Sequence, residues 1–385
     1  MEWGGDKMSP HLFDPVSPPA NIWPQGQADV RAYIEGIAQH GPTHMAENVS
    51  AKWRALRSGG RVFPVTINDG EVGGSYVCLP HSAYILYARE ELDLVDIGLL
   101  APFMRGLIKL ASPLLLGAGI NKIVQLDNWL LSTNLHGDWA GEDISQIRTY
   151  LMAKYPKHIL ALRSLDDWSC PKLLSVCKDD GWVLLPSRQI WVTDDMKAEW
   201  TPRHSSKNDK RHFNKAKLSI EDITIMTTPD AERIAQLYYM LYVGKYSPLN
   251  PVFTPAYIKM TCEAGLFSYR CARDESGTIM AVSGALIRGD ILTPPVVGYD
   301  TDRPQKEGLY RIACYLFNQQ AMTQGLRVNG SAGAASFKRH RGAHARIEYS
   351  AFYVGHLPLR RRAVIKTLAV LLNRLAVPMM KRKQL

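Results

Sequence analysis

The order of strands and helices in the second half of the chain constrains the fold most strongly. Residues 222–227 (DITIMT) predict a strand, and two helices follow, each with a proline at its expected start, Pro229 and Pro255. Proline is favoured there because its fixed φ suits the first helical turn and its missing N–H is not needed. The next expected elements are three strands, a long helix and two further strands, at 267–273, 279–288, 291–299, 309–324, 327–329 and 345–354. A short helix fits between the last two strands. Few α+β folds use this order, so it narrows the fold class more than composition does.

The long helix has the clearest periodicity in the chain. Its apolar positions recur at i, i+3, i+4, i+7, i+8 and i+12, and they are Leu309, Ile312, Ala313, Leu316, Phe317 and Ala321. That spacing places them on one face of an α-helix. Gly325 follows the last turn, where a left-handed glycine commonly ends a helix.

The first half repeats part of this order. Its expected strands are 61–68 (RVFPVTIN), 75–78, 84–88, 122–126, 158–162 and 182–185, with helices at 143–152 and 171–177. In the helix at 143–152, Ile144, Ile147 and Leu151 share one face. We therefore expect an α+β protein with two domains, each a mixed, mostly antiparallel sheet flanked by helices.

Two motifs in the second half are rich in lysine, arginine and glycine. The first is a basic helix, Ser205 to Leu218 (SSKNDKRHFNKAKL), directly before the first strand of this half. The second is Asn329 to Gly342 (NGSAGAASFKRHRG), after the strand that follows the long helix. Glycine lets the backbone approach a ligand closely, so the second motif is a candidate ligand loop.

Together with the element order, these motifs resemble the tandem-GNAT family, which includes Fem-type peptidoglycan aminoacyltransferases and the cellulose-biosynthesis-associated GNAT domain. The positions that match the linker helix of that family are Lys207, Arg211, Lys215 and Ala216. The positions that match its late motif are Gly330, Gly333, Phe337, Lys338 and Gly342. The resemblance implies an N-terminal extension (1–60), a degenerate GNAT-like domain (61–200), a catalytic GNAT domain with its linker helix (201–357) and a basic amphipathic C-terminal helix (358–385).

The resemblance also implies a site for an acyl donor. GNAT enzymes bind the donor pyrophosphate at a glycine-rich turn that opens the long helix, where free N–H groups and the helix dipole meet anionic oxygen. Here the turn reads Arg303-Pro-Gln-Lys-Glu-Gly-Leu-Tyr310, in which only Gly308 keeps its place. The charges of Arg303 and Lys306 would then replace lost N–H donors. The other expected donor-binding residues are Gly330, Gly333, Lys207 and Arg211.

Acyl transfer to an amine needs a group at the developing oxyanion, a proton acceptor and an acid for the leaving group. The resemblance assigns these roles to Lys338, to Asp300 or Glu307, and to Tyr310. Each residue also has a purely structural interpretation. Lys338 can belong to a solvated basic cluster, and Tyr310 can be a packed aromatic ring. Asp300 and Glu307 can be acids that stabilise the positive end of the helix dipole at a helix N-terminus. In the basic helix, Lys207, Arg211 and Lys215 form one row, which is typical either of a phosphate contact or of a solvated face.

Composition excludes several other classes of protein. Lys and Arg (46) exceed Asp and Glu (36) by ten, but residues 202–217 and 358–385 together hold a net +13, so the rest of the chain carries −3. The chain is therefore not a generally basic nucleic-acid coat.

Its six cysteines show no Cys-x-x-Cys pair, and the pairs His40/His44 and His340/His344 are each interrupted by glycine, so we expect no metal. The first 26 residues have no apolar core typical of a secretory signal, which favours a cytoplasmic protein with reduced thiols.

The C-terminal segment combines an apolar stripe with basic flanks. The stripe comprises Val364, Ile365, Leu368, Leu371, Leu372 and Leu375. It lies between Arg360-Arg-Arg362 and Lys381-Arg-Lys383. This pattern permits either packing of the stripe on the domain, which we favour, or contact with an anionic membrane surface.

These features predict an acyltransferase that moves an acyl group from a thioester, on coenzyme A or an acyl-carrier protein, to a small-molecule or peptide amine by direct attack. One alternative is transfer of an aminoacyl group from charged tRNA, which the basic helix favours. Another is an inactive GNAT scaffold that serves as an adaptor at a membrane or nucleic acid. No prosthetic group is expected, and the sequence leaves the acyl chain, the acceptor and the oligomeric state open.

Overall fold

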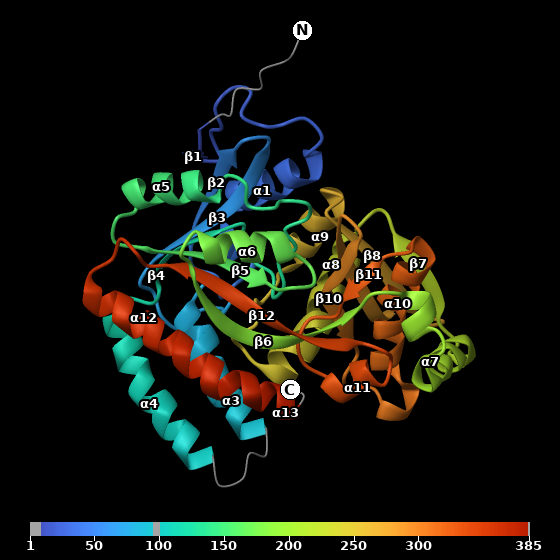
Figure 1. Ribbon diagram of the computed structural model, residues 1–385. Helices are drawn as coiled ribbons and strands as arrows, with labels where there is room; N and C mark the ends of the chain where they lie inside the picture. Colours follow the sequence, from blue (N-terminus) through green and yellow to red (C-terminus); the bar gives the residue numbers. More distant parts are fainter. Residues whose placement is uncertain (1–8, 95–100, 384–385) are drawn as a thin grey trace.

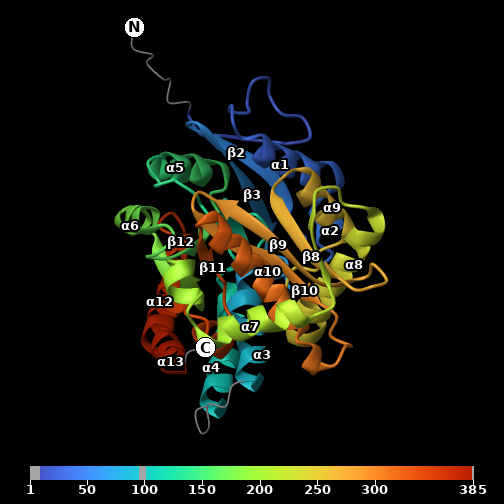
Figure 2. The ribbon, with the colours of Figure 1, turned by 90° about the vertical axis from the view of Figure 1, so that its right-hand side faces the viewer.

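One continuous sheet of twelve strands runs through the computed structural model, which describes residues 9–94 and 101–383 (Figure 1). The strand order is β1-β2-β3-β4-β5-β12-β6-β11-β10-β9-β8-β7. Helices cover both faces of the sheet (Figure 2). The expected mixed α+β fold is confirmed, and the two expected sheets are joined into one.

The first half contributes β1 to β6. Its elements are β1 (His11–Phe13), α1 (Ala28–His40), α2 (Pro42–Met45), β2 (Lys52–Ser58), β3 (Arg61–Asp69), α3 (Tyr87–Leu94), α4 (Ala101–Gly117), β4 (Lys122–Leu126), α5 (Ile144–Lys154), β5 (Ile159–Leu165), α6 (Pro171–Asp179) and β6 (Val183–Thr193). Residues before position 61, which we expected to form an extension, thus supply two strands and two helices to this half.

The second half contributes β7 to β12. Its elements are α7 (His204–Lys215), β7 (Ser219–Ile223), α8 (Thr228–Tyr238), α9 (Pro255–Glu263), β8 (Phe267–Arg273), β9 (Ile279–Arg288), β10 (Ile291–Tyr299), α10 (Leu309–Gln324), β11 (Arg327–Asn329), α11 (Ala335–Arg339) and β12 (His344–Tyr353). The long helix α10 buries its expected apolar face and ends at Gly325, whose φ is +68°.

The two halves share one element order. In each, a strand, two helices and two strands precede a strand that pairs in parallel with the next one, β4 with β5 and β10 with β11. A helix joins each parallel pair, α5 in the first half and α10 in the second. The first half differs by the insertion of α3 and α4 between β3 and β4.

The last strand of each half crosses to the other half. β6 pairs antiparallel with β11 of the second half, and β12 pairs antiparallel with β5 of the first half. β6 and β12 also pair with each other from His344↔Val192 to Phe352↔Val183. This exchange fuses the halves through backbone hydrogen bonds, so neither half completes its sheet alone.

Two expected strands of the first half are wrong. Residues 76–78 form a turn. Residues 84–88 lie in a π-helical segment, Ser82–Leu86 (η1), and at the start of α3. Both edges of β3 are already occupied, by β2 and β4, so no edge is left there for a further strand. Ile85 instead packs among Leu115, Ile120 and Ile123 beneath the sheet.

The C-terminal segment forms one long helix. It consists of α12 (Leu359–Leu371), a π-helical segment, Leu372–Ala376 (η6), and α13 (Val377–Lys383). Ile365, Leu368 and Ala369 are buried against the sheet beside Leu185 and Phe352. Part of the expected apolar stripe is therefore packed, while Leu371 and Leu375 stay exposed.

Candidate functional site

The parallel strands of the second half pair over a short distance only. β10 and β11 are joined at Ile291↔Arg327 and Leu292↔Val328, and β10 then bulges between Thr293 and Val296 and continues to Tyr299. β11 ends at Asn329. The residues beyond this divergence come from α10, α11 and the glycine-rich turn, which are the elements that carry the sequence-predicted site.

An aromatic cluster lies at this divergence. The Tyr310 ring centroid is 5.7 Å from that of Tyr299 and 4.9 Å from that of Phe337. Burial raises the pKa of Tyr310 well above its usual value of 10, so its hydroxyl stays protonated. Tyr310 can therefore donate a hydrogen bond, while its ring serves the packing that the plainer interpretation expects.

Lys338 closes the glycine-rich turn. Its Nζ donates to the carbonyl oxygens of Gly330 (2.6 Å), Ser331 (3.2 Å) and Ala332 (2.7 Å). Burial lowers the pKa of Lys338 to about 7, and the nearby charge of Arg188 acts in the same direction. The three carbonyl oxygens match the three N–H donors of an ammonium group. In this arrangement Lys338 holds the turn rather than pointing to an open position.

The turn itself is tied to β6. The N–H of Gly330 donates to the Trp191 carbonyl oxygen at 2.8 Å, and the N–H of Trp191 donates to the Ser331 carbonyl oxygen at 3.1 Å. A Cβ at position 330 would lie 3.3 Å from the Trp191 oxygen, a tight contact that a small shift of the neighbouring strand would have to relieve. At Gly333 φ is +75°, a conformation that favours glycine although the space around it is open.

Both expected bases are held in ion pairs. Asp300 Oδ2 is 2.7 Å from Nη2 of Arg233, and Glu307 Oε2 is 2.9 Å from Nε of Arg303. Each carboxylate thus has a cationic partner at the rim of the second half. Asp300 directly follows Tyr299, and Glu307 lies three residues before Tyr310, so both remain predicted bases close in sequence to the aromatic cluster.

The N-terminus of α10 is covered by a histidine. Gly308 has a φ of +63° and caps the helix without a side chain, and a Cβ there would overlap the imidazole of His212 from α7. His212 Nε2 also lies 2.6 Å from the Glu307 carbonyl oxygen. Lys306 is exposed in this turn.

The basic helix α7 is anchored by its single acid. Asp209 is buried and accepts from Nε and Nη2 of Arg341, at 2.5 and 2.8 Å. The Arg341 guanidinium also lies over the Phe337 ring, 3.3 Å from its centroid. Lys207 and Arg211 are exposed on the other side of the helix. The bidentate pair therefore fixes α7 so that its basic row faces solvent.

A polar network joins the two halves at Arg188 of β6. Its Nε donates to Glu348 of β12 at 2.8 Å, and its Nη2 donates to Thr133 Oγ1 at 2.7 Å. Thr133 Oγ1 in turn donates to Ser331 Oγ in the glycine-rich turn, at 3.1 Å. Arg188 is thus linked both to the first half and to the turn that Lys338 closes.

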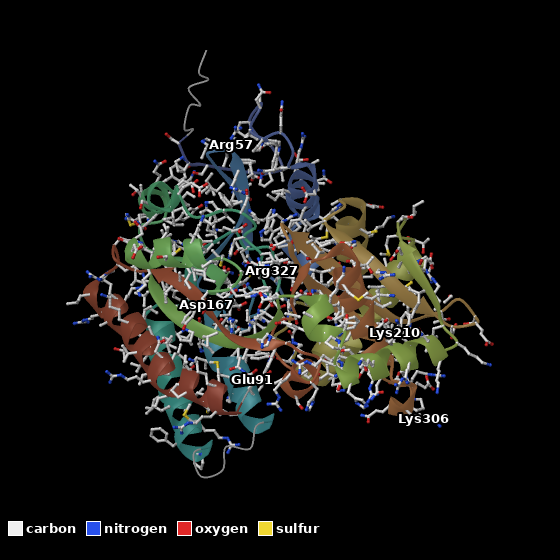
Figure 3. The ribbon with its side chains drawn as sticks, turned by 45° about the vertical axis from the view of Figure 1, so that its right-hand side comes forward. Arg57, Glu91, Asp167, Lys210, Lys306 and Arg327 are labelled. Atoms are coloured by element: carbon white, nitrogen blue, oxygen red, sulfur yellow. The ribbon has the colours of Figure 1, made fainter. Side chains whose placement is uncertain are left out.

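Glu91 of α3 faces the same network. Burial raises the pKa of Glu91 to about 7, while the charge of Arg188 works against that shift. The side chain nevertheless remains solvent-exposed. A carboxylate that is surrounded by protein and still reaches water is suited to exchange a proton near neutral pH. Figure 3 shows Glu91 below the central strands β6 and β12.

Tyrosines connect Glu91 and Arg188 to the aromatic cluster. Arg188 interacts electrostatically with Tyr76, Tyr87 and Tyr242, and Tyr242 interacts with Tyr310. Sequence reasoning missed Arg188, Glu348 and Glu91. The available signal was a charge inside each of two apolar strands, Arg188 in VLLPSRQIWVT and Glu348 in HARIEYSAFY, whereas nothing marked Glu91.

The described cavities and histidine pairs lie outside this network. A cavity of about 380 Å³ adjoins β6 and β12 at Gln189, Trp191, Arg339, His344 and Lys381. The rings of His40 and His44 are 5.3 Å apart, yet no group of three or more metal-ligating side chains occurs among the described residues.

The chain was compared with known families, curated proteins and solved structures. No family model and no curated protein matches it. Among solved structures, FemX matches with a TM-score of 0.45 and 9% identity over 58% of this chain and 78% of its own. L-PGS from Bacillus licheniformis matches with a TM-score of 0.44 and 13% identity over 59% of this chain and 79% of its own.

A tandem GNAT protein from the clavulanic acid pathway covers more of the chain. It spans 86% of this chain and 91% of its own, with a TM-score of 0.37 and 11% identity. The fold is a tandem GNAT-like fold. This fold is evident in the repeated element order and in the two parallel strand pairs, β4 with β5 and β10 with β11.

Proposed function

We propose that this protein is an acyltransferase that joins an acyl group to an amine where β10 and β11 diverge. The observation that carries the proposal is the convergence on Arg188 of an ionisable carboxylate, Glu91, and the turn closed by Lys338. Tyr242 interacts electrostatically with both Arg188 and Tyr310.

Glu91 is our candidate for the proton acceptor. An amine is protonated at neutral pH and must lose a proton before it attacks. With a pKa of about 7, Glu91 is partly ionised there and can accept that proton. The neutral amine then attacks the carbonyl carbon of the donor and the bond to the leaving group breaks. The attacking nitrogen passes its second proton to the leaving thiolate or hydroxyl oxygen, and an amide forms.

The other residues assist without forming a covalent intermediate. Tyr310 remains protonated and can donate a hydrogen bond to the leaving atom. Lys338 fixes the glycine-rich turn, so we assign it a positioning role and keep the oxyanion role as the alternative. Arg188 donates hydrogen bonds to Glu348 and Thr133, and these bonds fix the position of β6 relative to β12 and to the segment that contains Thr133.

The donor remains a choice between a thioester and a charged tRNA. Arg303, Lys306 and Gly308 at the start of α10 support a phosphate contact for coenzyme A or an acyl-carrier protein, although His212 covers that turn. The exposed row of Lys207 and Arg211 supports the phosphate backbone of tRNA. A cytoplasmic location suits both donors.

The test measures product formation from acyl-coenzyme A, acyl-carrier protein and aminoacyl-tRNA with a panel of amines, by mass spectrometry. We expect the pH dependence of kcat/KM to rise through about pH 7 and Glu91→Gln to lose about 100-fold or more in rate, the typical contribution of a general base. The matched control is Glu232→Gln, an exposed glutamate on α8, which should leave the rate unchanged.

Two further arms separate the donors. Activity that ribonuclease destroys and that Lys207→Glu/Arg211→Glu weakens would assign tRNA as the donor, with Lys172→Glu on α6 as the exposed control. Transfer that survives ribonuclease assigns a thioester. No product from any donor with a folded protein would contradict the acyltransferase proposal and favour the adaptor alternative.

A further inference from the structure

Two helices on one side of the molecule expose apolar side chains to solvent. On α4 these are Phe103 (60% exposed), Leu110 (68%), Leu114 (62%) and Leu116 (38%). On the C-terminal helix they are Leu359 (75%), Val370 (48%), Leu371 (40%) and Leu375 (41%). We call these eight residues the apolar surface. Single exposed leucines are ordinary, but a group of this size on neighbouring helices marks an interaction site.

The two helices lie side by side. α4 and α12 run next to each other below the first half of the sheet (Figure 1), and they are in contact. Their inner faces share one core, in which Leu115 of α4 packs with Ile365 and Leu368 of α12. The exposed residues therefore belong to one continuous structural unit.

The charged residues on these two helices have one sign. Residues 101–117 hold Arg105 and Lys109 and no acid, and residues 358–385 hold eight Lys or Arg and no acid. The exposed basic side chains are Arg105, Lys109, Arg360, Lys366, Arg374, Lys381 and Arg382. Apolar side chains with a surrounding of basic ones are complementary to a bilayer that contains anionic lipids.

We propose that α4 and α12–α13 bind the surface of an anionic phospholipid bilayer, with the apolar surface entering the headgroup region. A second copy of this chain fits less well, because two surfaces with the same positive charge repel each other. The proposal is independent of the acyl transfer proposed above, since none of the eight residues belongs to the Arg188 network.

The geometry favours a helix that lies in the plane of the bilayer. By length and composition, Leu359–Arg382 is apolar enough to cross a membrane. However, Ile365, Leu368 and Ala369 are buried against the sheet. Arg361 also donates to the Ala118 carbonyl oxygen (2.6 Å) and to the Lys157 carbonyl oxygen (2.7 Å). These contacts hold the helix along the protein, so only its outer face is available to lipid.

The experiment is vesicle flotation with the full chain. Vesicles of phosphatidylcholine are compared with vesicles that also contain phosphatidylglycerol. We expect binding to the anionic vesicles only, and weaker binding as salt rises, because salt screens exposed charges. Leu110→Glu/Leu114→Glu should reduce binding by about tenfold or more, since it replaces apolar contacts with charges that repel the lipid.

The matched control is Ile225→Glu, an 81% exposed isoleucine on the other half of the molecule, which should bind as the unaltered protein does. Circular dichroism confirms that each variant is folded. If the double variant does not fold, Phe103→Trp gives a second readout. We expect its fluorescence to shift to the blue with anionic vesicles only.

Three outcomes would overturn the proposal. One is a folded protein that does not float with anionic vesicles, and another is equal flotation of the control and the double variant. The third is a dimer, seen by light scattering, that Leu110→Glu/Leu114→Glu converts to a monomer, because the apolar surface would then be an interface between two copies.

Discussion

At the scale of single residues, Lys338 shows how the same side chain supports two interpretations. The neighbouring glycines suggested that the Lys338 ammonium group contacts a ligand at this loop. In the structure its Nζ donates hydrogen bonds to three carbonyl oxygens of the loop itself. A residue that fixes a ligand loop and a residue that touches the ligand are both sensitive to substitution. The pH dependence of stability can separate the cost of its burial from its role in the reaction.

We predict that Lys338→Met changes the pH dependence of unfolding. The pKa of Lys338 is about 7 in the folded protein and about 10.5 in an unfolded chain. Between these values the unfolded chain binds more protons, so the stabilising contribution of this lysine falls as pH drops from 10.5 to 7. The unaltered protein should therefore gain melting temperature relative to Lys338→Met as pH rises from 7 to 10. Parallel melting curves across that range would contradict the lowered pKa.

At the scale of elements, α7 depends on one buried contact. The helix carries its basic row outward, and Asp209 and Arg341 form a bidentate pair on the inner side. The pair joins α7 to the segment that follows α11. It thereby connects the basic linker helix to the glycine-rich turn, two motifs that are more than a hundred residues apart in sequence.

We predict that Asp209→Ala destabilises the protein by about 3–5 kcal/mol, because it leaves the Arg341 guanidinium buried without its partner. Chemical denaturation measures the difference. The control is Glu263→Ala, which removes an exposed partner of Lys259 and should change stability by about 0–1 kcal/mol. Equal small effects of both variants would show that the Asp209 pair is not a fixed contact.

At the scale of the whole molecule, the exchange of β6 and β12 makes the two halves interdependent. β12 lies between β5 and β6, so each half needs a strand from the other to satisfy its backbone hydrogen bonds. The Arg188–Glu348 pair is built across the same two strands. The candidate site therefore exists only when both halves are folded together.

We predict one cooperative unfolding transition for the intact chain. Residues 1–202 and 203–385, produced separately, should each lack a cooperative transition, and mixing or co-expressing them should restore it. Calorimetry and circular dichroism measure both. Independent cooperative unfolding of either fragment would contradict the structural role that we assign to the exchanged strands.

The sequence alone determined the features that are local in the chain. Helix periodicity placed α10 and its end at Gly325, because those positions interact with neighbours three or four residues away. The element order of the second half and the spacing of its glycines and lysines led to the tandem GNAT-like fold. The expected strands at 75–78 and 84–88 failed because a short apolar run does not reveal whether a sheet edge is free for it.

Only the tertiary structure decided which side chains meet. Arg188 and Glu348 are 160 residues apart, and the strand exchange that pairs them leaves no pattern in either segment. Burial in the packed chain raises the pKa of Glu91, and Lys338 donates to carbonyl oxygens that the fold of the turn brings to it. Burial and long-range pairing are properties of the packed chain, which explains why the sequence indicated the fold more fully than the site.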